Sequence, residues 1–317
     1  MNTNVCAGID IGGTNSEIGL IDRDGNLLHS SRLSTRAYAE PVLFAKDLVT
    51  EIQKGLAETG ASLRGIGIGA PSANYYTGCI DRAPNLPWPG IIPLAKLVSD
   101  EAGTVCVITN DANASALGEQ LFGAAKFMHN FLVVTLGTGL GSGFIANNEV
   151  IYGHDGFAGE LGHVIVERNG RLCNCERKGC LETYVSATGI VTTAKEWLEF
   201  EGEDSLLKKI PVTELESRHI SEAAAKGDLL ALRLLDYTAE MLGIALANTA
   251  AITSPSHIFL YGGLAKAGDL LLVPTRRYFE ANLLRNYSGK ITIELSGLPD
   301  NAAVLGAAAL AWKELRD

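Results

Sequence analysis

The feature that most constrains the fold is a β-hairpin pattern that occurs twice along the chain. In the first copy, an apolar strand over residues 5–11 leads into a Gly/Thr turn, a strand over residues 17–21 and a polar turn. In the second copy, a strand over residues 131–136 leads into a glycine turn, a strand over residues 142–146 and the polar pair Asn147-Asn148. We interpret the pattern as an internal duplication, although any two glycine-containing hairpins share part of it. Together with the length of 317 residues, this predicts two domains.

Strands alternate with helices in both halves, which predicts an α/β architecture. Apolar residues at helical spacing or in short β-rich runs predict the remaining elements. The expected helices cover residues 41–59, 112–121, 182–197, 220–225, 229–252 and 302–315, and the further strands cover residues 27–33, 64–69, 105–108, 257–261 and 291–295. Because both copies open with hairpins, we expect mixed sheets rather than purely parallel ones.

Charge and composition exclude several classes of protein. The formal net charge is −10 and no long Lys/Arg run occurs, so a broad electrostatic grip on nucleic acid is not expected. No apolar stretch reaches the roughly 18 residues of a membrane span, and the N-terminus lacks a signal-peptide pattern, so we expect a cytoplasmic protein. Glycine accounts for 35 of the 317 residues, an excess that predicts tight turns or loops that approach a ligand closely.

The two glycine turns are candidate phosphate-binding loops. In the first, Gly12 and Gly13 let the backbone approach a phosphate, the Thr14 hydroxyl can donate to it, and Asp10 can hold a hydrated Mg²⁺. The alternative is an ordinary glycine hairpin, because neither Walker-A nor G-x-G-x-x-G spacing is present. A second turn at the matching place, Gly137-Thr138-Gly139, favours phosphate binding, since two such turns could hold one polyphosphate from both sides.

Asp111 is a candidate general base. It follows an apolar strand and precedes the helix expected over residues 112–121, a position that suits a carboxylate at the floor of an active site. The alternative is that Asp111 caps the helix. Asn85 lies in the sequence Pro-Asn-Leu-Pro and, by itself, is typical of a turn residue.

The most specific local pattern is His163 followed by Cys173, Cys175 and Cys180. A Cys₃His set is a common structural zinc site, and a disulfide is not expected in the cytosol, so we predict zinc. Bound zinc would fix the tautomer of His163 and leave its other ring nitrogen to donate to a substrate. Glu160 lies just before this set and Glu182 just after it. The alternative to a functional role for Glu182 is that it is a first-turn acid favoured by the helix dipole.

With these residues in view, the chain resembles the ROK family of sugar kinases and repressors, and in particular its bacterial glucokinases. The resemblance covers almost the whole length. Its motifs are Asp10-Ile11-Gly12-Gly13-Thr14, Ala83-Pro84-Asn85-Leu86, Asn110-Asp111-Ala112-Asn113, Leu136-Gly137-Thr138-Gly139, Glu160-Leu161-Gly162-His163, the three cysteines with Glu182, and Gly262-Gly263. Family members usually have glycine where this chain has Ser72 and Glu176.

The resemblance implies a two-lobed, actin-like, ribonuclease-H-type fold with a duplicated βββαβ-type core. The small N-terminal lobe would consist of residues 1–111 and 300–317, and the large lobe of residues 112–299 would carry the zinc site and a homodimer surface. It also implies residue roles. Sugar would be bound by Asn85, Asn110, Asp111, Glu160, His163 and Glu182, and ATP-Mg²⁺ by Asp10, Gly12, Gly13, Thr14, Gly137, Thr138, Gly139, Gly262 and Gly263.

The activity expected from the resemblance is ATP-dependent phosphorylation of a hexose at its 6-hydroxyl, with glucose as the expected substrate and Asp111 as general base. Kinases of N-acetylglucosamine, N-acetylmannosamine or fructose are alternatives. Outside the kinases, the alternatives are a non-catalytic, sugar-responsive regulator and, more remotely, an actin-like assembly ATPase. Repressors of the family carry a DNA-binding segment before the Asp-x-Gly-Gly-Thr motif, and because Asp10 lies near the start of this sequence, we expect no such segment here.

Overall fold

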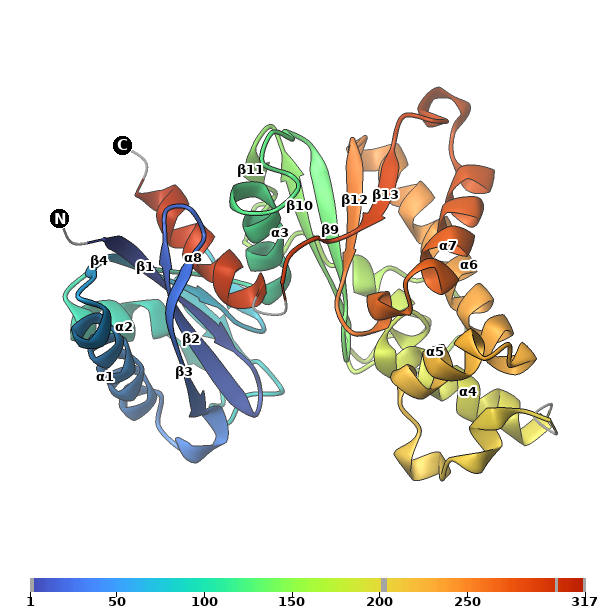
Figure 1. The fold of residues 1–317 in the computed structure, drawn as a ribbon, viewed down its shortest axis with the longest axis horizontal. Helices are drawn as coiled ribbons and strands as arrows, with labels where there is room; N and C mark the ends of the chain where they lie inside the picture. Colours follow the sequence, from blue (N-terminus) through green and yellow to red (C-terminus); the bar gives the residue numbers. More distant parts are fainter. Residues whose placement is uncertain (1–2, 201–203, 300–301, 316–317) are drawn as a thin grey trace. The chain divides into compact units, whose positions relative to one another are not determined.

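The computed structural model describes residues 3–200, 204–299 and 302–315 (Figure 1). Residues 1–2, 300–301 and 316–317, which fall in the expected N-terminal lobe, lie outside the described residues. Contacts group the chain into two compact units, unit 1 within 1–128, 149–158 and 297–317 and unit 2 within 129–148 and 159–296. The lobe division at residues 111 and 300 stays a prediction. None of the described helices is both long and apolar enough for a membrane span.

Unit 1 is built on a five-stranded sheet of order β3-β2-β1-β4-β8. Its strands are β1 (Asn4–Ile11), β2 (Asn15–Asp22), β3 (Leu27–Ser34), β4 (Ser62–Gly69) and β8 (Cys106–Thr109). β1 pairs antiparallel with β2 and parallel with β4, and β4 pairs parallel with β8. The helices are α1 (Pro41–Thr59), α2 (Leu94–Ala102), α3 (Asp111–Leu121) and α8 (Ala302–Glu314), and the short strands are β5 (Ala73–Asn74), β6 (Cys79–Asp81), β7 (Ile91–Ile92) and β11 (Glu149–Val150).

Unit 2 repeats this arrangement. Its strands β10 (Leu140–Ala146), β9 (Phe131–Leu136), β12 (His257–Tyr261) and β13 (Thr292–Leu295) lie side by side in that order. β10 and β9 are antiparallel, whereas β9, β12 and β13 are parallel. This is the order and direction of β2, β1, β4 and β8 in unit 1, which supports the internal duplication. The helices are α4 (Ala187–Phe200), α5 (Ser217–Ala225), α6 (Leu229–Thr253) and α7 (Asp269–Asn282).

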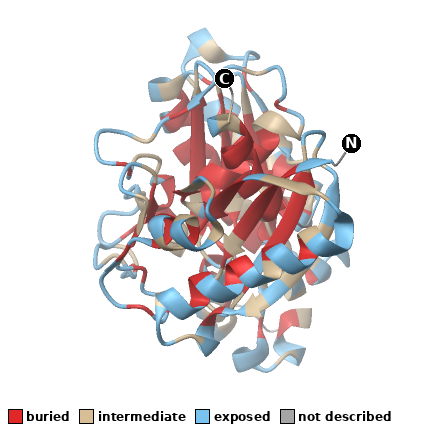
Figure 2. Cartoon of the chain, turned by 90° about the vertical axis from the view of Figure 1, so that its left-hand side faces the viewer, coloured by how far each residue is buried: buried red, intermediate tan, exposed pale blue. Residues whose placement is uncertain are grey.

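Several strand glycines of unit 1 are explained by helix packing rather than by turns. A Cβ built on Gly8 or Gly67 would collide with the backbone of α8, and one on Gly306 of α8 would collide with the backbone of α3. The glycines therefore let helix backbone approach the sheet and a neighbouring helix closely. As a result, residues 304–312 of α8 are all buried, and Figure 2 shows the strands of the sheet as buried behind a helix whose outward side is exposed. Close packing thus accounts for part of the glycine excess, beside the turns that the sequence predicted.

Most predicted elements lie within a few residues of the observed ones, but some predictions were wrong or incomplete. The helix expected over residues 182–197 begins at Ala187, and Glu182 lies instead in the 3₁₀ turn η3 (Leu181–Thr183). Helix α7 was not predicted because Pro274 lies inside it, and proline is a strong signal against a helix interior. The short helix α2 and the small sheet β5-β6-β7 were also missed.

Candidate active site

The candidate residues of unit 1 gather at one edge of its sheet. In the strand register, Asp10 of β1 pairs with Gly69 of β4, and Gly69 pairs with Thr109 of β8. The first glycine turn follows β1, and α3 begins at Asp111, two residues after β8 ends. Because parallel strands bring their carboxyl ends to the same edge, Asp10 and Asp111 lie near each other, at the edge where open α/β sheets commonly bind ligands.

The electrostatics of this edge favour a bound cation. Desolvation, the charge of Asp111 and the charge of Glu17 together raise the pKa of Asp10 to about 7. The Asp111 side chain is open to solvent, yet the protein around it still desolvates the carboxylate and raises its pKa. Two carboxylates that oppose each other's ionisation are a donor set that fits Mg²⁺, which prefers oxygen ligands and neutralises their repulsion.

The structure separates the two roles considered for Asp111. The helix cap is Asn110, whose Oδ1 accepts a hydrogen bond from the Asn113 N–H at 2.7 Å. Asp111 is the first residue of α3, and its Oδ1 accepts the Ala112 N–H at 2.8 Å. The N-cap interpretation of Asp111 is therefore wrong, because the preceding residue already satisfies the end of the helix.

The first glycine turn is held by several polar contacts within unit 1. The Gly12 N–H donates to the Asn15 carbonyl at 3.0 Å, and the Thr35 N–H donates to the Thr14 carbonyl at 3.0 Å. A Cβ on Gly13 would lie 2.6 Å from the Asn85 carbonyl oxygen, so the Asn85 loop packs directly on this turn. Arg36 donates from Nε to the Gly13 carbonyl at 3.3 Å. Nothing in the sequence around Arg36 indicated this position.

The second glycine turn, in unit 2, is also closed by a backbone hydrogen bond, since the Gly137 N–H donates to the Gly139 carbonyl at 3.0 Å. Gly262 and Gly263 follow β12, and a Cβ on Gly262 would lie 2.7 Å from the Leu136 carbonyl oxygen at the end of β9. By contrast, a Cβ on Gly137 or Gly263 would meet nothing within 4 Å. Packing therefore does not require glycine at these two positions, which leaves space for a ligand to approach the backbone.

Glu182 contacts the second turn directly. Its Oε2 accepts the Leu140 N–H at 2.9 Å, and a Cβ on Gly139 would collide with the same oxygen. The interpretation of Glu182 as an acid that merely complements a helix dipole is therefore incomplete. Its carboxylate fixes the turn that the sequence assigned to nucleotide, while the family resemblance assigns the same residue to sugar.

The structure brings together the four residues predicted to bind zinc. The donor atoms of His163, Cys173, Cys175 and Cys180 all lie within 4.8 Å of one another. Nδ1 of His163 lies 3.6 Å from the Cys173 sulfur, and the Cys175 and Cys180 sulfurs are 3.5 Å apart. Three soft thiol donors and one imidazole in a closed cluster fit a structural zinc ion.

Hydrogen bonding prepares one of these thiols for a metal. Desolvation by itself would raise the pKa of Cys175, but hydrogen bonds from the Arg177 backbone and side chain and from the other two thiols outweigh it and lower the pKa to about 6. Cys175 is therefore poised as a thiolate, the form that binds metal. On the opposite side of the His163 ring, Nε2 lies 3.9 Å from a carboxylate oxygen of Glu160, so the imidazole is placed between the thiols and Glu160.

Ser72 and Glu176, where family members usually have glycine, both adopt left-handed backbone conformations, with φ of 53° and 67°. Side chains with a Cβ are strained in this region, whereas glycine is not.

We therefore expect Ser72→Gly and Glu176→Gly each to raise the free energy of unfolding by about 0.5–1 kcal/mol, measured by urea denaturation. Gly137→Ala, where φ is not left-handed and a Cβ meets nothing, is the matched control and should change stability little. A loss of stability in both glycine variants would contradict the prediction.

The fold and these motifs define a family of sugar kinases and repressors: the chain belongs to the ROK family, whose model matches residues 6–314. It is 35% identical over 305 residues to a glucokinase of Halalkalibacterium halodurans, covering 94% of this chain and 92% of the relative. A crystal structure of a ROK family glucokinase from Streptomyces griseus, in complex with glucose and AMPPNP, is 34% identical with a TM-score of 0.81, and covers 98% of this chain and 99% of that one. The xylose repressor of Caldicellulosiruptor bescii is 31% identical over 270 residues, covering 85% of this chain and 67% of the relative.

These likenesses confirm the predicted family and the predicted fold class, an α/β, actin-like sugar-kinase fold with a duplicated core.

Proposed function

We propose that this protein transfers the γ-phosphoryl group of ATP to the 6-hydroxyl of glucose. The observation that carries the proposal is the pair Asp10 and Asp111 at the same sheet edge as the first glycine turn. It is supported by full-length similarity to glucokinases, one of which was solved with glucose and AMPPNP. Asp10 is placed to hold Mg²⁺, and Asp111, at the start of α3, to accept a proton.

In the proposed reaction, Asp111 accepts the proton of the attacking sugar hydroxyl while the phosphoryl group passes in line to the sugar oxygen. Mg²⁺, held through Asp10, would supply charge neutralisation for the phosphates. Because this transition state is loose, positioning and charge stabilisation dominate over covalent chemistry. The open backbone at Gly137 and Gly263 and the turn over Gly12, Gly13 and Thr14 supply N–H groups for the phosphates.

For the sugar, the proposed contacts are the residues that the family resemblance implies, Asn85, Asn110, Asp111, Glu160, His163 and Glu182. Asn110 can serve two partners, because its Oδ1 caps α3 and its amide N–H groups, which that bond does not use, can donate to a ligand. Polar groups built to pair sugar hydroxyls reject analogues that lack them, since an unpaired buried group is costly. We therefore expect deoxy sugars to be poor substrates.

The test is a panel of glucose, N-acetylglucosamine, N-acetylmannosamine and fructose with ATP in a coupled ADP-release assay. The proposal expects glucose to give the highest kcat/KM. A clear preference for an amino sugar or fructose would keep the kinase and change its substrate. Sugar binding without ADP release from any member would overturn the enzyme and favour a sugar-responsive regulator, a candidate supported by the likeness to the xylose repressor.

We also propose that the Cys₃His cluster holds one structural zinc ion. Protein purified without chelators is expected to contain about one zinc per chain, and Cys175→Ser to lose the metal and thermal stability, because structural zinc contributes directly to folding. Cys79→Ser is the matched control, since Cys79 lies on β6 outside the cluster. Elemental analysis and thermal unfolding give the two readouts. An active protein free of zinc would refute the site. The homodimer implied by the family stays a prediction, which the molar mass measured by light scattering would test.

A further inference from the structure

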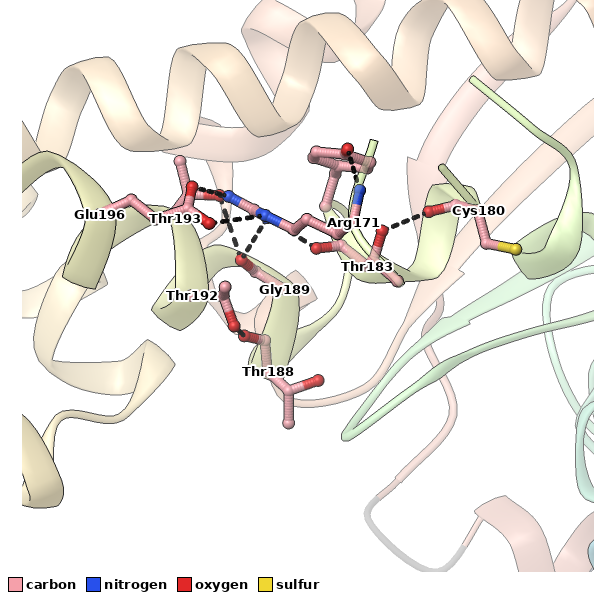
Figure 3. Close-up of polar contacts among 9 residues, drawn as sticks. Arg171, Cys180, Thr183, Thr188, Gly189, Thr192, Thr193 and Glu196 are labelled. Atoms are coloured by element: carbon pink, nitrogen blue, oxygen red, sulfur yellow. Dashed lines mark hydrogen bonds and ion pairs between the residues drawn. The ribbon is translucent and has the colours of Figure 1, made fainter. Parts of the chain in front are cut away.

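Arg171 has an extensively hydrogen-bonded side chain close in sequence to the Cys₃His cluster of unit 2, and neither motif nor mechanism uses it. It lies two residues before Cys173, and its side chain is only 16% exposed. Figure 3 shows its guanidinium reaching across to η3 and α4. The aromatic ring of Tyr184 lies beneath the guanidinium carbon at 4.6 Å, and the Tyr184 hydroxyl accepts the Arg171 backbone N–H at 3.0 Å.

All five N–H donors of this guanidinium have partners. Nη1 donates to the carbonyls of Thr183 at 2.7 Å and Gly189 at 3.3 Å, and Nη2 donates to Thr193 Oγ1 at 3.0 Å. Nε donates to Glu196 Oε1 at 3.1 Å, and Nη2 also pairs with Glu196 Oε2. A planar fork with fixed donor directions is suited to hold several acceptors in one geometry, which a lysine ammonium is not.

The backbone segment that Arg171 fixes is the one that holds the second glycine turn. The Ala187 N–H donates to the Gly137 carbonyl at 2.8 Å, and the Thr188 hydroxyl donates to the Thr138 carbonyl at 2.7 Å. Glu182, the residue before Thr183, accepts the Leu140 N–H. Residues 182–189 are therefore bonded to Arg171 through Thr183 and Gly189. The same segment is bonded to the glycine turn through Glu182, Ala187 and Thr188.

This segment needs an external anchor because it is not regular helix. It passes from the 3₁₀ turn η3 to α4 through residues 184–186, so the Thr183 carbonyl, which Arg171 binds, lies outside the α-helical ladder. Its other side-chain hydrogen bonds join residues close in sequence: the Thr183 hydroxyl donates to the Cys180 carbonyl at 2.7 Å, and the Ser186 hydroxyl donates to the Glu182 carbonyl at 2.8 Å and accepts the Gly189 N–H at 2.9 Å. A small displacement here would move all three contacts to the glycine turn together.

We propose that Arg171 is a positioning residue for the nucleotide: it locks η3 and the start of α4 so that Glu182, Ala187 and Thr188 hold residues 137–140 in the conformation that binds phosphates. The inference rests on the proposed function, which assigns this turn to ATP. It differs from a purely structural role of Arg171, because it predicts that the KM for ATP rises more than the KM for glucose.

The test is steady-state kinetics of Arg171→Met and Arg171→Lys, with zinc content and melting temperature measured on the same samples. Both variants are expected to raise KM for ATP by about 10-fold and KM for glucose by a clearly smaller factor, because Glu182 is the one residue of the three holding the turn that is also a proposed sugar contact. Zinc content is expected to stay at the wild-type level. Lysine should rescue little, since three donors on one atom cannot span these acceptors.

The matched control is Arg277→Met. Arg277 also makes an ion pair, with Asp236 at 2.6 Å, and stacks over a tyrosine, Tyr278, at 4.5 Å, but it lies on α7 and holds no part of the turn. Arg277→Met should leave both KM values unchanged. Should the Arg171 variants not fold, Thr188→Val tests the same link, because it removes only the hydroxyl that reaches the Thr138 carbonyl; its expected result is a higher KM for ATP at an unchanged melting temperature.

The outcomes distinguish a failure of the positioning role of Arg171 from a failure of the proposed kinase activity. If wild-type protein phosphorylates glucose but the Arg171 and Thr188 variants keep the wild-type KM for ATP, or raise both KM values equally, the positioning role is wrong. If wild-type protein neither phosphorylates a sugar nor binds AMPPNP in a calorimetric titration, the proposed function itself has failed. Loss of zinc in the Arg171 variants would also overturn the inference, since the effect would then arise at the metal cluster.

Discussion

Replacing Asp111 with Asn is expected to lower kcat for glucose phosphorylation by about 10²–10⁴-fold while glucose still binds. The carboxamide has the same shape and keeps an oxygen that can accept the Ala112 N–H, as Asp111 does at 2.8 Å. The Asn110 cap of α3 is also unchanged. The variant therefore loses mainly the ability to take a proton from the attacking hydroxyl. ADP-release kinetics measure kcat, and calorimetric titration measures glucose affinity.

The matched control for this variant is Asp269→Asn. Asp269 is the first residue of α7, as Asp111 is of α3, so the control removes a carboxylate from the same helical position without touching the sheet edge. We expect it to keep wild-type kcat. Removal of a general base is expected to lower kcat by at least about 10²-fold. If Asp111→Asn lowered kcat by less than about 10-fold, the assignment of the base would be wrong.

The pH profile provides an independent readout of the same group. Desolvation raises the pKa of Asp111 above its ordinary value, so the carboxylate is lost at a higher pH than a solvated Asp, whose pKa is about 3.9. A general base acts in its deprotonated form, and kcat/KM for glucose is therefore expected to fall as the pH falls through this raised value. The acidic limb of the wild-type profile should therefore lie at a higher pH than a solvated aspartate would give.

The elements that sequence reasoning placed well are those whose signal is local. The two hairpins, the strand before Asp111 and α6 all follow from short apolar runs and from turn residues beside them. Thr253 ends α6, and Ser254 adopts a left-handed conformation just before Pro255, as the Ser-Pro pair predicted. The Cys₃His cluster was equally accessible, because its ligands are close in sequence and chemically distinctive.

The contacts that sequence reasoning missed are made between segments that are distant or carry no motif. Arg171 bonds residues up to 25 positions away, as its contact with Glu196 shows, and an isolated arginine gives no pattern. Asn110 and Asp111 are both good helix-capping residues, so only the backbone decides which one caps α3. Helix α7 was missed because Pro274 lies inside it. The helix forms nevertheless, since burial of its apolar face outweighs the unfavourable proline.

The second large effect is expected at Asp10, where Asn should impair catalysis and stabilise the fold at the same time. Loss of the carboxylate that we propose to hold Mg²⁺ is expected to cost several kcal/mol of transition-state stabilisation, or at least about 10²-fold in kcat. Stability should rise because desolvation and the charges of Asp111 and Glu17 oppose ionisation of Asp10 and raise its pKa to about 7. The wild-type protein bears this unfavourable charge once the pH exceeds the raised pKa, and Asn removes it.

The sign of the pH dependence follows from that raised pKa. A carboxyl group that binds its proton more tightly in the folded state favours folding at low pH, and this contribution is lost as the pH rises through the folded-state value of about 7. The advantage of Asp10→Asn over wild type should therefore be near zero at pH 4 and largest at pH 8. Since Asp10 is partly exposed, we expect about 1–2 kcal/mol at pH 8 rather than the full value of a three-unit shift.

Asp22, at the other end of the same hairpin, provides a control of opposite sign. Desolvation would raise its pKa, but hydrogen bonds from the Asn26 side chain and the N–H groups of Asn26 and Asp24 outweigh it and lower the pKa. Asp22→Asn should therefore destabilise the protein at pH 8, and the difference from wild type should shrink as the pH falls through the pKa of Asp22. Urea denaturation of both variants at pH 4, 6 and 8 would decide the matter. If Asp10→Asn instead destabilised the protein at pH 8, as Asp22→Asn is expected to do, the surroundings of Asp10 would not oppose its ionisation, and the cation site proposed at this sheet edge would lose its physical basis.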